Sequence, residues 1–127
     1  MKNNFKNNKL FTIGVEEEYM LCSPDNFELI DKADHVMENL DLKYKDRYSY
    51  ELLLSEIESN TPICDNVDKS INEISKLRVN LKENGKKFGF NIGISGTHPT
   101  ADPAKQNFIK NESYKWVRKE LKYYASQ

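Results

Sequence analysis

The chain has 127 residues, of which 19 are basic and 20 acidic, and its formal net charge is −1. With 38% hydrophobic and 11% aromatic residues, this composition is typical of a single folded domain and excludes disordered and fibrous classes of protein. The near balance of charge gives no overall attraction to a phosphate backbone, and no apolar run is long enough to cross a bilayer. We therefore expect neither a nucleic-acid partner nor a membrane partner.

The first residues and the two cysteines suggest a cytoplasmic protein. Residues 1–10 are polar, contain no apolar signal segment and are expected to form a flexible lead. Cys22 and Cys64 are the only cysteines, and they lack the spacing of a metal site. We interpret both as ordinary reduced thiols, and we expect residues 11–127 to belong to one domain.

Residues 11–22 are predicted to form a strand in which three consecutive carboxylates interrupt an apolar run. Side chains alternate along a strand, so Glu16 and Glu18 share one face while Glu17 lies on the other. The two carboxylates on the shared face would be about 7 Å apart, and a divalent cation would turn their repulsion into attraction. Hard cations such as Mg²⁺ bind oxygen ligands, often a few carboxylates together with substrate phosphates. The alternative is a solvated edge strand whose charges protect against aggregation.

Turn residues follow this strand at 23–26, so residues 27–30 are predicted to return as the second arm of a hairpin. Residues 31–42 then carry apolar side chains at helical spacing and are predicted to form a helix. A charged connection at 43–47 leads to the next acidic stretch.

That second acidic stretch, residues 48–62, again places carboxylates among apolar side chains, and one continuous strand is predicted over 48–58. On such a strand Glu56 and Glu58 share a face, whereas Glu51 falls on the other face unless a bulge intervenes. A charged strand end that needs no ligand is the alternative interpretation.

The most regular pattern belongs to a long helix, which Asp65 or Asn66 is predicted to cap and Gly85 to end. Lys86 and Lys87 would then lie near the negative end of the helix dipole. The apolar face of this helix is expected to pack on a sheet. That face consists of Val67, Ile71, Ile74, Leu77 and Leu81.

Strict alternation predicts a further strand over 90–95. Its buried side chains are expected to be Phe90, Ile92 and Ile94. The strand leads to His98, which can be a proton donor, a ligand contact or a polar loop residue. Asn111 is then predicted to cap a final helix. The apolar face of this helix would contain Tyr114, Val117, Leu121 and Tyr124.

Four segments, in the same order, resemble the amino-terminal part of a known enzyme family. They are Ile-Gly-Val-Glu-Glu-Glu at 13–18, Glu-Leu-Leu-Leu-Ser-Glu-Ile-Glu-Ser-Asn-Thr-Pro at 51–62, Ile-Ser-Lys-Leu-Arg at 74–78 and Ser-Gly-Thr-His-Pro at 95–99. Together they are similar to the type 2 glutamate-cysteine ligase family, also called the carboxylate-amine ligases, within the glutamine synthetase-like superfamily. The resemblance covers residues 11–127, and four ordered motifs are far more specific than any one of them.

The resemblance implies an ATP-dependent ligase that joins a carboxylate to an amine through an acyl phosphate and uses Mg²⁺ or Mn²⁺. The typical substrates are glutamate and cysteine, whose product, γ-glutamylcysteine, belongs to glutathione biosynthesis. Clustered glutamates agree with this chemistry, because phosphoryl transfer depends on positioning and on cation charge that neutralises phosphate oxygens. The expected partners are these small molecules and, for the complete protein, further copies of itself.

The resemblance also implies a set of metal ligands. Glu16 and Glu18 match the Glu-x-Glu metal strand of the family, and Glu58 matches the glutamate before its Thr-Pro. Glu51 matches a further acidic position, against the parity of one continuous strand. The candidates for lining the site near the substrate are Thr61 and His98.

The implied fold class is α+β, with a partial glutamine synthetase-like curved antiparallel sheet and helices packed on one side of it. Its strands are expected near 11–22, 27–30, 48–58 and 90–95. A His-x-His strand of the family and the basic residues that hold nucleotide phosphates would lie beyond residue 127. The chain is therefore expected to be a fragment that is inactive alone.

Two other classes of protein stay open at this point. One is a non-catalytic divalent-metal-binding or interaction module derived from the same fold. The other is an intact small α+β domain whose acidic strands are only solvated edges, which predicts no metal site tighter than scattered surface carboxylates give.

Overall fold

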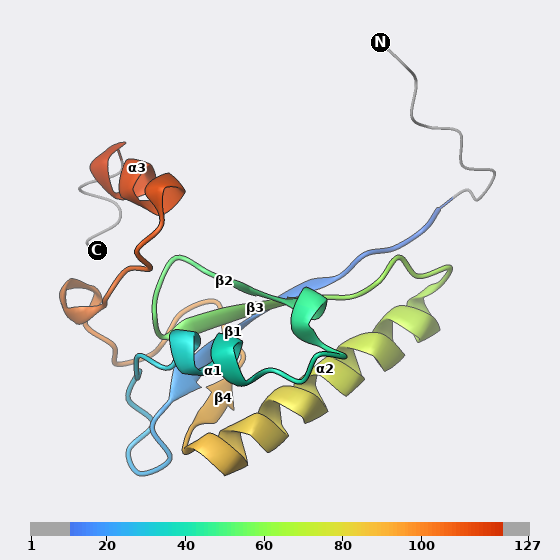
Figure 1. Ribbon diagram of the computed structural model, residues 1–127, viewed down its shortest axis with the longest axis horizontal. Helices are drawn as coiled ribbons and strands as arrows, with labels where there is room; N and C mark the ends of the chain where they lie inside the picture. Colours follow the sequence, from blue (N-terminus) through green and yellow to red (C-terminus); the bar gives the residue numbers. More distant parts are fainter. Residues whose placement is uncertain (1–10, 121–127) are drawn as a thin grey trace.

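The computed structural model describes residues 11–120, except for the side chains of residues 113 and 118 (Figure 1). It contains an antiparallel sheet of four strands in the order β2-β3-β1-β4 and confirms the α+β class. The strands are β1 (Glu16–Cys22), β2 (Tyr48–Tyr50), β3 (Glu56–Asn60) and β4 (Asn91–Gly93). The helices are α1 (Ala33–Asn39), α2 (Val67–Phe88) and α3 (Glu112–Glu120), and short 3-10 turns lie at Lys45–Arg47 and Pro103–Lys105. In this part of the chain, no helix combines the length and apolar character that a membrane crossing requires.

Alternation along the strands gives the sheet one apolar face and one acidic face. The fully buried side chains of the apolar face include Tyr19, Leu21 and Ile57. Two tyrosines of β2 connect this face to the helices. The Tyr48 hydroxyl donates a hydrogen bond to the Leu77 carbonyl of α2 at 2.7 Å. The Tyr50 hydroxyl donates to the Asp34 carboxylate of α1 at 2.9 Å. The expected packing of helices on one side of the sheet is confirmed for α1 and α2.

Helix α2 begins where the sequence predicts but ends later than predicted. The Asn66 side chain accepts a hydrogen bond from the Lys69 N–H at 2.9 Å and caps the first turn. The helix continues through Gly85 and ends before Gly89, which adopts a left-handed φ of 73°. Gly85 is required for a different reason, because a Cβ there would lie 2.4 Å from the Phe90 carbonyl oxygen. The prediction that Gly85 ends the helix is therefore wrong.

The apolar face of α2 is only partly buried. Ile74, Leu77 and Leu81 pack into the core as predicted. Val67 and Ile71 are 58% and 57% exposed, so their predicted burial is wrong. Both lie in the first two turns of α2, which extend past the end of β3 (Figure 1).

The predicted continuous strand over 48–58 is wrong. Residues on either side of a loop form a hairpin instead, in which Tyr48 lies opposite Ser59 and Tyr50 lies opposite Ile57. The hairpin reverses the chain between β2 and β3, so side-chain parity cannot be counted across it.

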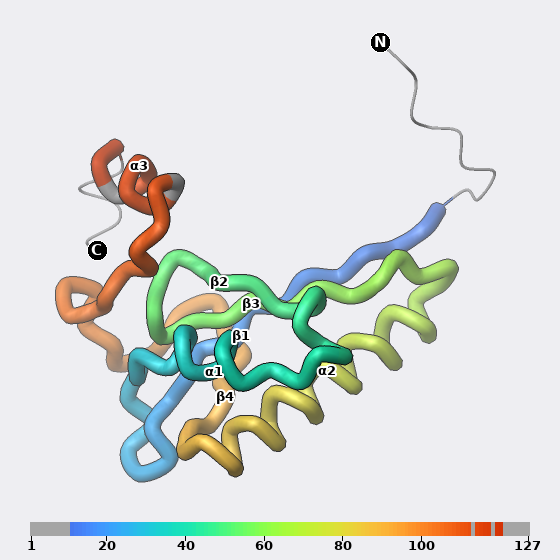
Figure 2. Tube along the Cα trace, in the orientation of Figure 1, coloured from blue at the N-terminus to red at the C-terminus, as the bar shows by residue number. Residues whose placement is uncertain are grey.

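Long-range contacts stabilise this reversal at residues 51–55. The Ile109 N–H donates to the Leu52 carbonyl at 3.1 Å. The Leu54 N–H donates to the Asn107 carbonyl at 2.8 Å. The two segments lie side by side in the Cα trace (Figure 2). The backbone groups of Leu52 and Leu54 are therefore satisfied by residues far away in the sequence.

Residues 28–30 return antiparallel to residues 21–23, as the hairpin prediction expects, but they form only a single bridge between Leu29 and Cys22 and no regular strand. The Phe27 N–H donates to the Ser23 carbonyl at 3.0 Å, and Phe27 has a φ of 60°. This left-handed residue keeps the segment in a turn until just before the bridge.

The remaining elements are shorter than predicted. Helix α1 lies within the predicted 31–42, and β4 lies within the predicted 90–95. Ile94 follows the end of β4 and is 50% exposed, so its predicted burial is wrong. Before β1, Ile13 forms only an isolated bridge with Cys64. Helix α3 confirms a helix after residue 111. The predicted positions outside the described residues are 1–10, Leu121 and Tyr124.

Candidate metal centre

Two glutamates lie directly opposite each other on the acidic face, Glu18 of β1 and Glu58 of β3. In the same pair of segments, the Leu21 N–H donates to the Ser55 carbonyl at 2.8 Å. Hydrogen-bonded positions alternate along an antiparallel pair, so the two glutamates occupy a non-hydrogen-bonded position. Side chains approach most closely at such positions, and like charges placed there repel. The pair is costly unless a cation or a proton compensates for the repulsion.

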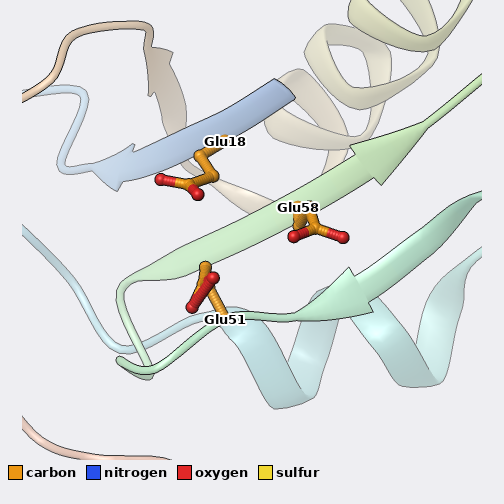
Figure 3. A group of neighbouring side chains, drawn as sticks. All are labelled: Glu18, Glu51 and Glu58. Carbon is orange, nitrogen blue, oxygen red and sulfur yellow. The ribbon is translucent and has the colours of Figure 1, made fainter. Parts of the chain in front are cut away.

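Glu51 joins this pair from the loop that follows β2. Carboxylate oxygens of Glu18, Glu51 and Glu58 all lie within 4.8 Å of one another. Figure 3 shows the three side chains on neighbouring segments, from β1, β3 and the chain after β2. The expectation that Glu51 falls on the opposite face is wrong, because the hairpin and not strand parity determines its position.

Burial and mutual repulsion raise the pKa of two carboxyl groups in this region. Burial is the main cause of the raised pKa of Glu51, and the Leu52 N–H opposes it by donating to the carboxylate. The charges of Glu18 and Glu58 raise the pKa of Glu51 further. The pKa of Glu56 is raised by burial first and then by the charges of Glu51 and Glu18. The neighbouring charges account for the smaller part of each pKa shift, and a bound cation would offset that negative field.

The donor set fits a hard divalent cation. Mg²⁺ and Mn²⁺ prefer oxygen ligands, and the group offers one carboxylate from each of three chain segments. Two further residues lie beside this group, of which Ser49 has no signal in the sequence. The Ser49 hydroxyl donates to Glu58 Oε1 at 3.0 Å and restrains that carboxylate. Glu56 shares the face of Glu58, as strand parity predicts, whereas the position of Ser49 depends on the hairpin register.

Glu16 and Glu17, which precede Glu18 in the run of three glutamates, have different surroundings. Glu16 is exposed, lies opposite Asn60 and is not part of the carboxylate group, so its role as a ligand stays a prediction. Glu17 lies on the apolar face and forms an ion pair with Arg78 of α2. This hydrogen-bonded pairing is the main cause that lowers the pKa of Glu17.

Thr61 follows β3 directly, and it connects this segment to the backbone just before β1. Its hydroxyl accepts a hydrogen bond from the Val15 N–H at 3.0 Å, and its own N–H donates to the Val15 carbonyl at 2.9 Å. The side chain is buried, and these bonds account for its position. A contact between Thr61 and a substrate stays a prediction.

Both ring nitrogens of His98 contact backbone groups. Nδ1 accepts hydrogen bonds from the N–H groups of Thr100 and Ala101, at 3.3 and 3.1 Å. The proton therefore resides on Nε2, which donates to the Phe27 carbonyl at 2.9 Å. His98 thus joins the turn before Leu29 to its own loop, and a role toward substrate stays a prediction.

The two cysteines form no disulfide. Cys22 and Cys64 are free and buried. Burial raises the pKa of the Cys22 thiol, which disfavours the reactive thiolate. Both findings agree with the interpretation of ordinary thiols.

Comparison with known proteins gives a consistent result. The model of the glutamate-cysteine ligase family 2 matches residues 12–127. A protein of Rubrobacter xylanophilus named "Putative glutamate–cysteine ligase 2-1" is 30% identical over 120 residues, which are 94% of this chain and 32% of the relative. A protein of Herpetosiphon aurantiacus named "Putative glutamate–cysteine ligase 2" is 31% identical over 111 residues, or 87% of this chain and 29% of the relative. One of Paracoccus denitrificans with the same name is 28% identical over 111 residues, with 87% and 30% covered.

The chain thus spans about a third of the length of these relatives. The family model nevertheless covers almost the whole chain, including the strands that carry the three clustered glutamates. On this evidence the chain belongs to the glutamate-cysteine ligase family 2.

Proposed function

We propose that this chain provides the cation-binding face of an ATP-dependent carboxylate-amine ligase, which joins glutamate or a similar carboxylate to cysteine or another amine through an acyl phosphate. Family membership supports the ligase class. The names of the relatives support glutamate and cysteine as the substrates. The observation that carries the proposal is the approach of three carboxylates to within 4.8 Å on one face of the sheet.

Glu18, Glu51 and Glu58 are the residues that would hold Mg²⁺ or Mn²⁺. The cation would supply positive charge that neutralises the phosphate oxygens of the nucleotide during phosphoryl transfer. The protein supplies preorganisation, because Ser49 restrains Glu58 and the Leu52 N–H restrains Glu51. Side chains fixed in this way need little rearrangement when a charged ligand arrives.

The complete reaction is proposed for a protein of the relatives' length. We expect the 127-residue chain tested alone to bind the cation without forming product, since it spans only about a third of those proteins. Glutamate, the amine and ATP are proposed as small-molecule partners of the longer protein.

Titration with Mn²⁺, followed by loss of the free-ion electron paramagnetic resonance signal, tests the cation site. We expect Glu58→Gln to weaken binding at least about tenfold, because affinity follows the number of charged ligands. Glu83→Gln is the matched control, because Glu83 is an exposed α2 carboxylate paired with Lys86. Equal affinities of the two variants would contradict the proposal.

A second assay separates the ligase from a non-catalytic metal-binding module. In a protein of the relatives' length, ADP release should depend on both glutamate and an amine. Cation binding without ADP release across a panel of amines would favour the module.

A further inference from the structure

A polar network on the opposite face of the sheet lies directly behind the carboxylate group. Arg78 Nε donates to Glu17 Oε2 at 2.7 Å, and Arg78 Nη2 contacts the other carboxylate oxygen. This two-point pairing joins β1 to α2, and the Glu17 side chain is only 13% exposed. A guanidinium bound through both oxygens fixes the orientation of a carboxylate as well as its position.

The network continues from β1 to β3. The Ser59 hydroxyl donates to the Tyr19 hydroxyl oxygen at 3.3 Å, and Ser59 lies opposite Glu17 in the strand register. Glu17 and Tyr19 are the chain neighbours of Glu18, so both peptide groups that flank Glu18 are restrained from the apolar face. Ser59 likewise follows Glu58. The residues that hold the strands together therefore alternate with the residues that form the carboxylate group.

We infer that Arg78 is a positioning residue for the carboxylate group, acting through Glu17 to hold β1 where Glu18 faces Glu58. A strand that shifts by one residue sends every side chain to the other face, so the arrangement depends on a fixed register. A smaller displacement of β1 would already separate the carboxylates. The role of this group as a cation site rests on the proposed function, whereas the effect of Arg78 on the strand does not.

Two measurements on the full 127-residue chain test this inference. The first is the Hα–Hα nuclear Overhauser effect between Glu18 and Glu58 without metal, which a non-hydrogen-bonded antiparallel pair should give strongly. The second is the affinity for Mn²⁺. We expect Arg78→Gln to weaken the Overhauser effect and to lower the Mn²⁺ affinity about tenfold, as for residues that orient metal ligands. Lys86→Gln is the control, because it removes an equal charge from the same helix at a residue paired with Glu83.

Further variants separate positioning from charge. Glu17→Gln should reproduce the effect of Arg78→Gln, and the double variant should be no worse than either single variant. Arg78→Lys retains the charge but not the two-point contact, so it should bind Mn²⁺ less tightly than the wild type. Full recovery with lysine would show that Arg78 acts by charge alone and would overturn the inference.

The outcomes distinguish this inference from the proposed function. If Arg78→Gln keeps both the Overhauser effect and the Mn²⁺ affinity of Lys86→Gln, the positioning role is wrong while the cation site stands. If the wild type binds Mn²⁺ no better than Glu58→Gln does, the cation site is wrong. The Overhauser effect in the metal-free variants then still decides whether Arg78 positions β1.

Discussion

Glu18 and Glu58 are cross-strand partners at a non-hydrogen-bonded position, where two side chains approach most closely. Placing two carboxylates there costs stability, and Glu51 adds a third negative charge within 4.8 Å. The same arrangement favours a divalent cation. The acidic face therefore lowers the stability of the fold when no metal is bound.

Removing one charge of this pair should stabilise the metal-free chain. We expect Glu58→Gln to raise the free energy of unfolding by about 0.2–1 kcal/mol, the usual range for a cross-strand pair. Gln keeps an oxygen that can accept the hydrogen bond from Ser49. Urea unfolding in EDTA measures the change, and adding Mn²⁺ should then stabilise the wild type more than the variant. A less stable Glu58→Gln chain in EDTA would contradict this account.

The pH dependence of stability should reflect the raised pKa of Glu56. Burial is the main cause, followed by the charges of Glu51 and Glu18. Between the ordinary glutamate pKa and the raised folded-state pKa, the folded chain binds the proton more tightly than the unfolded chain. The contribution of Glu56 is therefore fully present below the ordinary pKa and is lost as pH rises through the folded-state pKa. Glu56→Gln should reduce this loss in urea midpoints measured from pH 4 upward in EDTA, and an unchanged slope would contradict the assignment.

His98 should act on stability and not on cation binding. His98→Ala removes the ring that bonds to Phe27, Thr100 and Ala101, and we expect a loss of about 1–2 kcal/mol. Urea unfolding measures that loss, with Mn²⁺ affinity as the internal control. In a protein of the relatives' length, a fall in kcat larger than the stability loss explains would instead support contact with substrate.

The substitution Gly85→Ala tests whether steric contact or helix propensity has the larger effect on stability near the end of α2. Alanine is favoured over glycine by about 1 kcal/mol inside a helix. A Cβ at Gly85, however, would lie 2.4 Å from the Phe90 carbonyl oxygen. We expect Gly85→Ala to destabilise the chain by about 1–3 kcal/mol, as overpacking does. Gly96→Ala is the control, because a Cβ there has no neighbour within 4 Å among the described residues. A gain in thermal stability for Gly85→Ala would show that propensity prevails.

Local signals in the sequence were sufficient for several elements. The Asn66 cap, the apolar spacing of α2 and the alternation around β4 all depend on neighbouring residues, and the structure confirms them in part. The opposition of Glu18 and Glu58 is not local, but their parity on separate strands was correct. The resemblance to the family names Glu18, Glu51 and Glu58 together with Glu16, and the structure brings the first three together while Glu16 lies outside the group.

The position of Glu51 could not be derived from strand periodicity. It depends on a chain reversal whose backbone groups pair with residues 107 and 109, more than 50 positions away in the sequence. The error at Gly85 is local, because the Gly89 and Phe90 N–H groups both donate to the Gly85 carbonyl, and Gly89 is the left-handed residue that ends α2. Only the error at Glu51 arose where tertiary contacts override a local pattern.

The most direct test is anomalous X-ray scattering from a crystal of this chain soaked with Mn²⁺. The proposed function predicts an anomalous peak among the carboxylates of Glu18, Glu51 and Glu58, and the peak would also show whether Glu16 contacts the ion. Peaks confined to surface carboxylates elsewhere, with the three glutamates unliganded, would contradict the central claim.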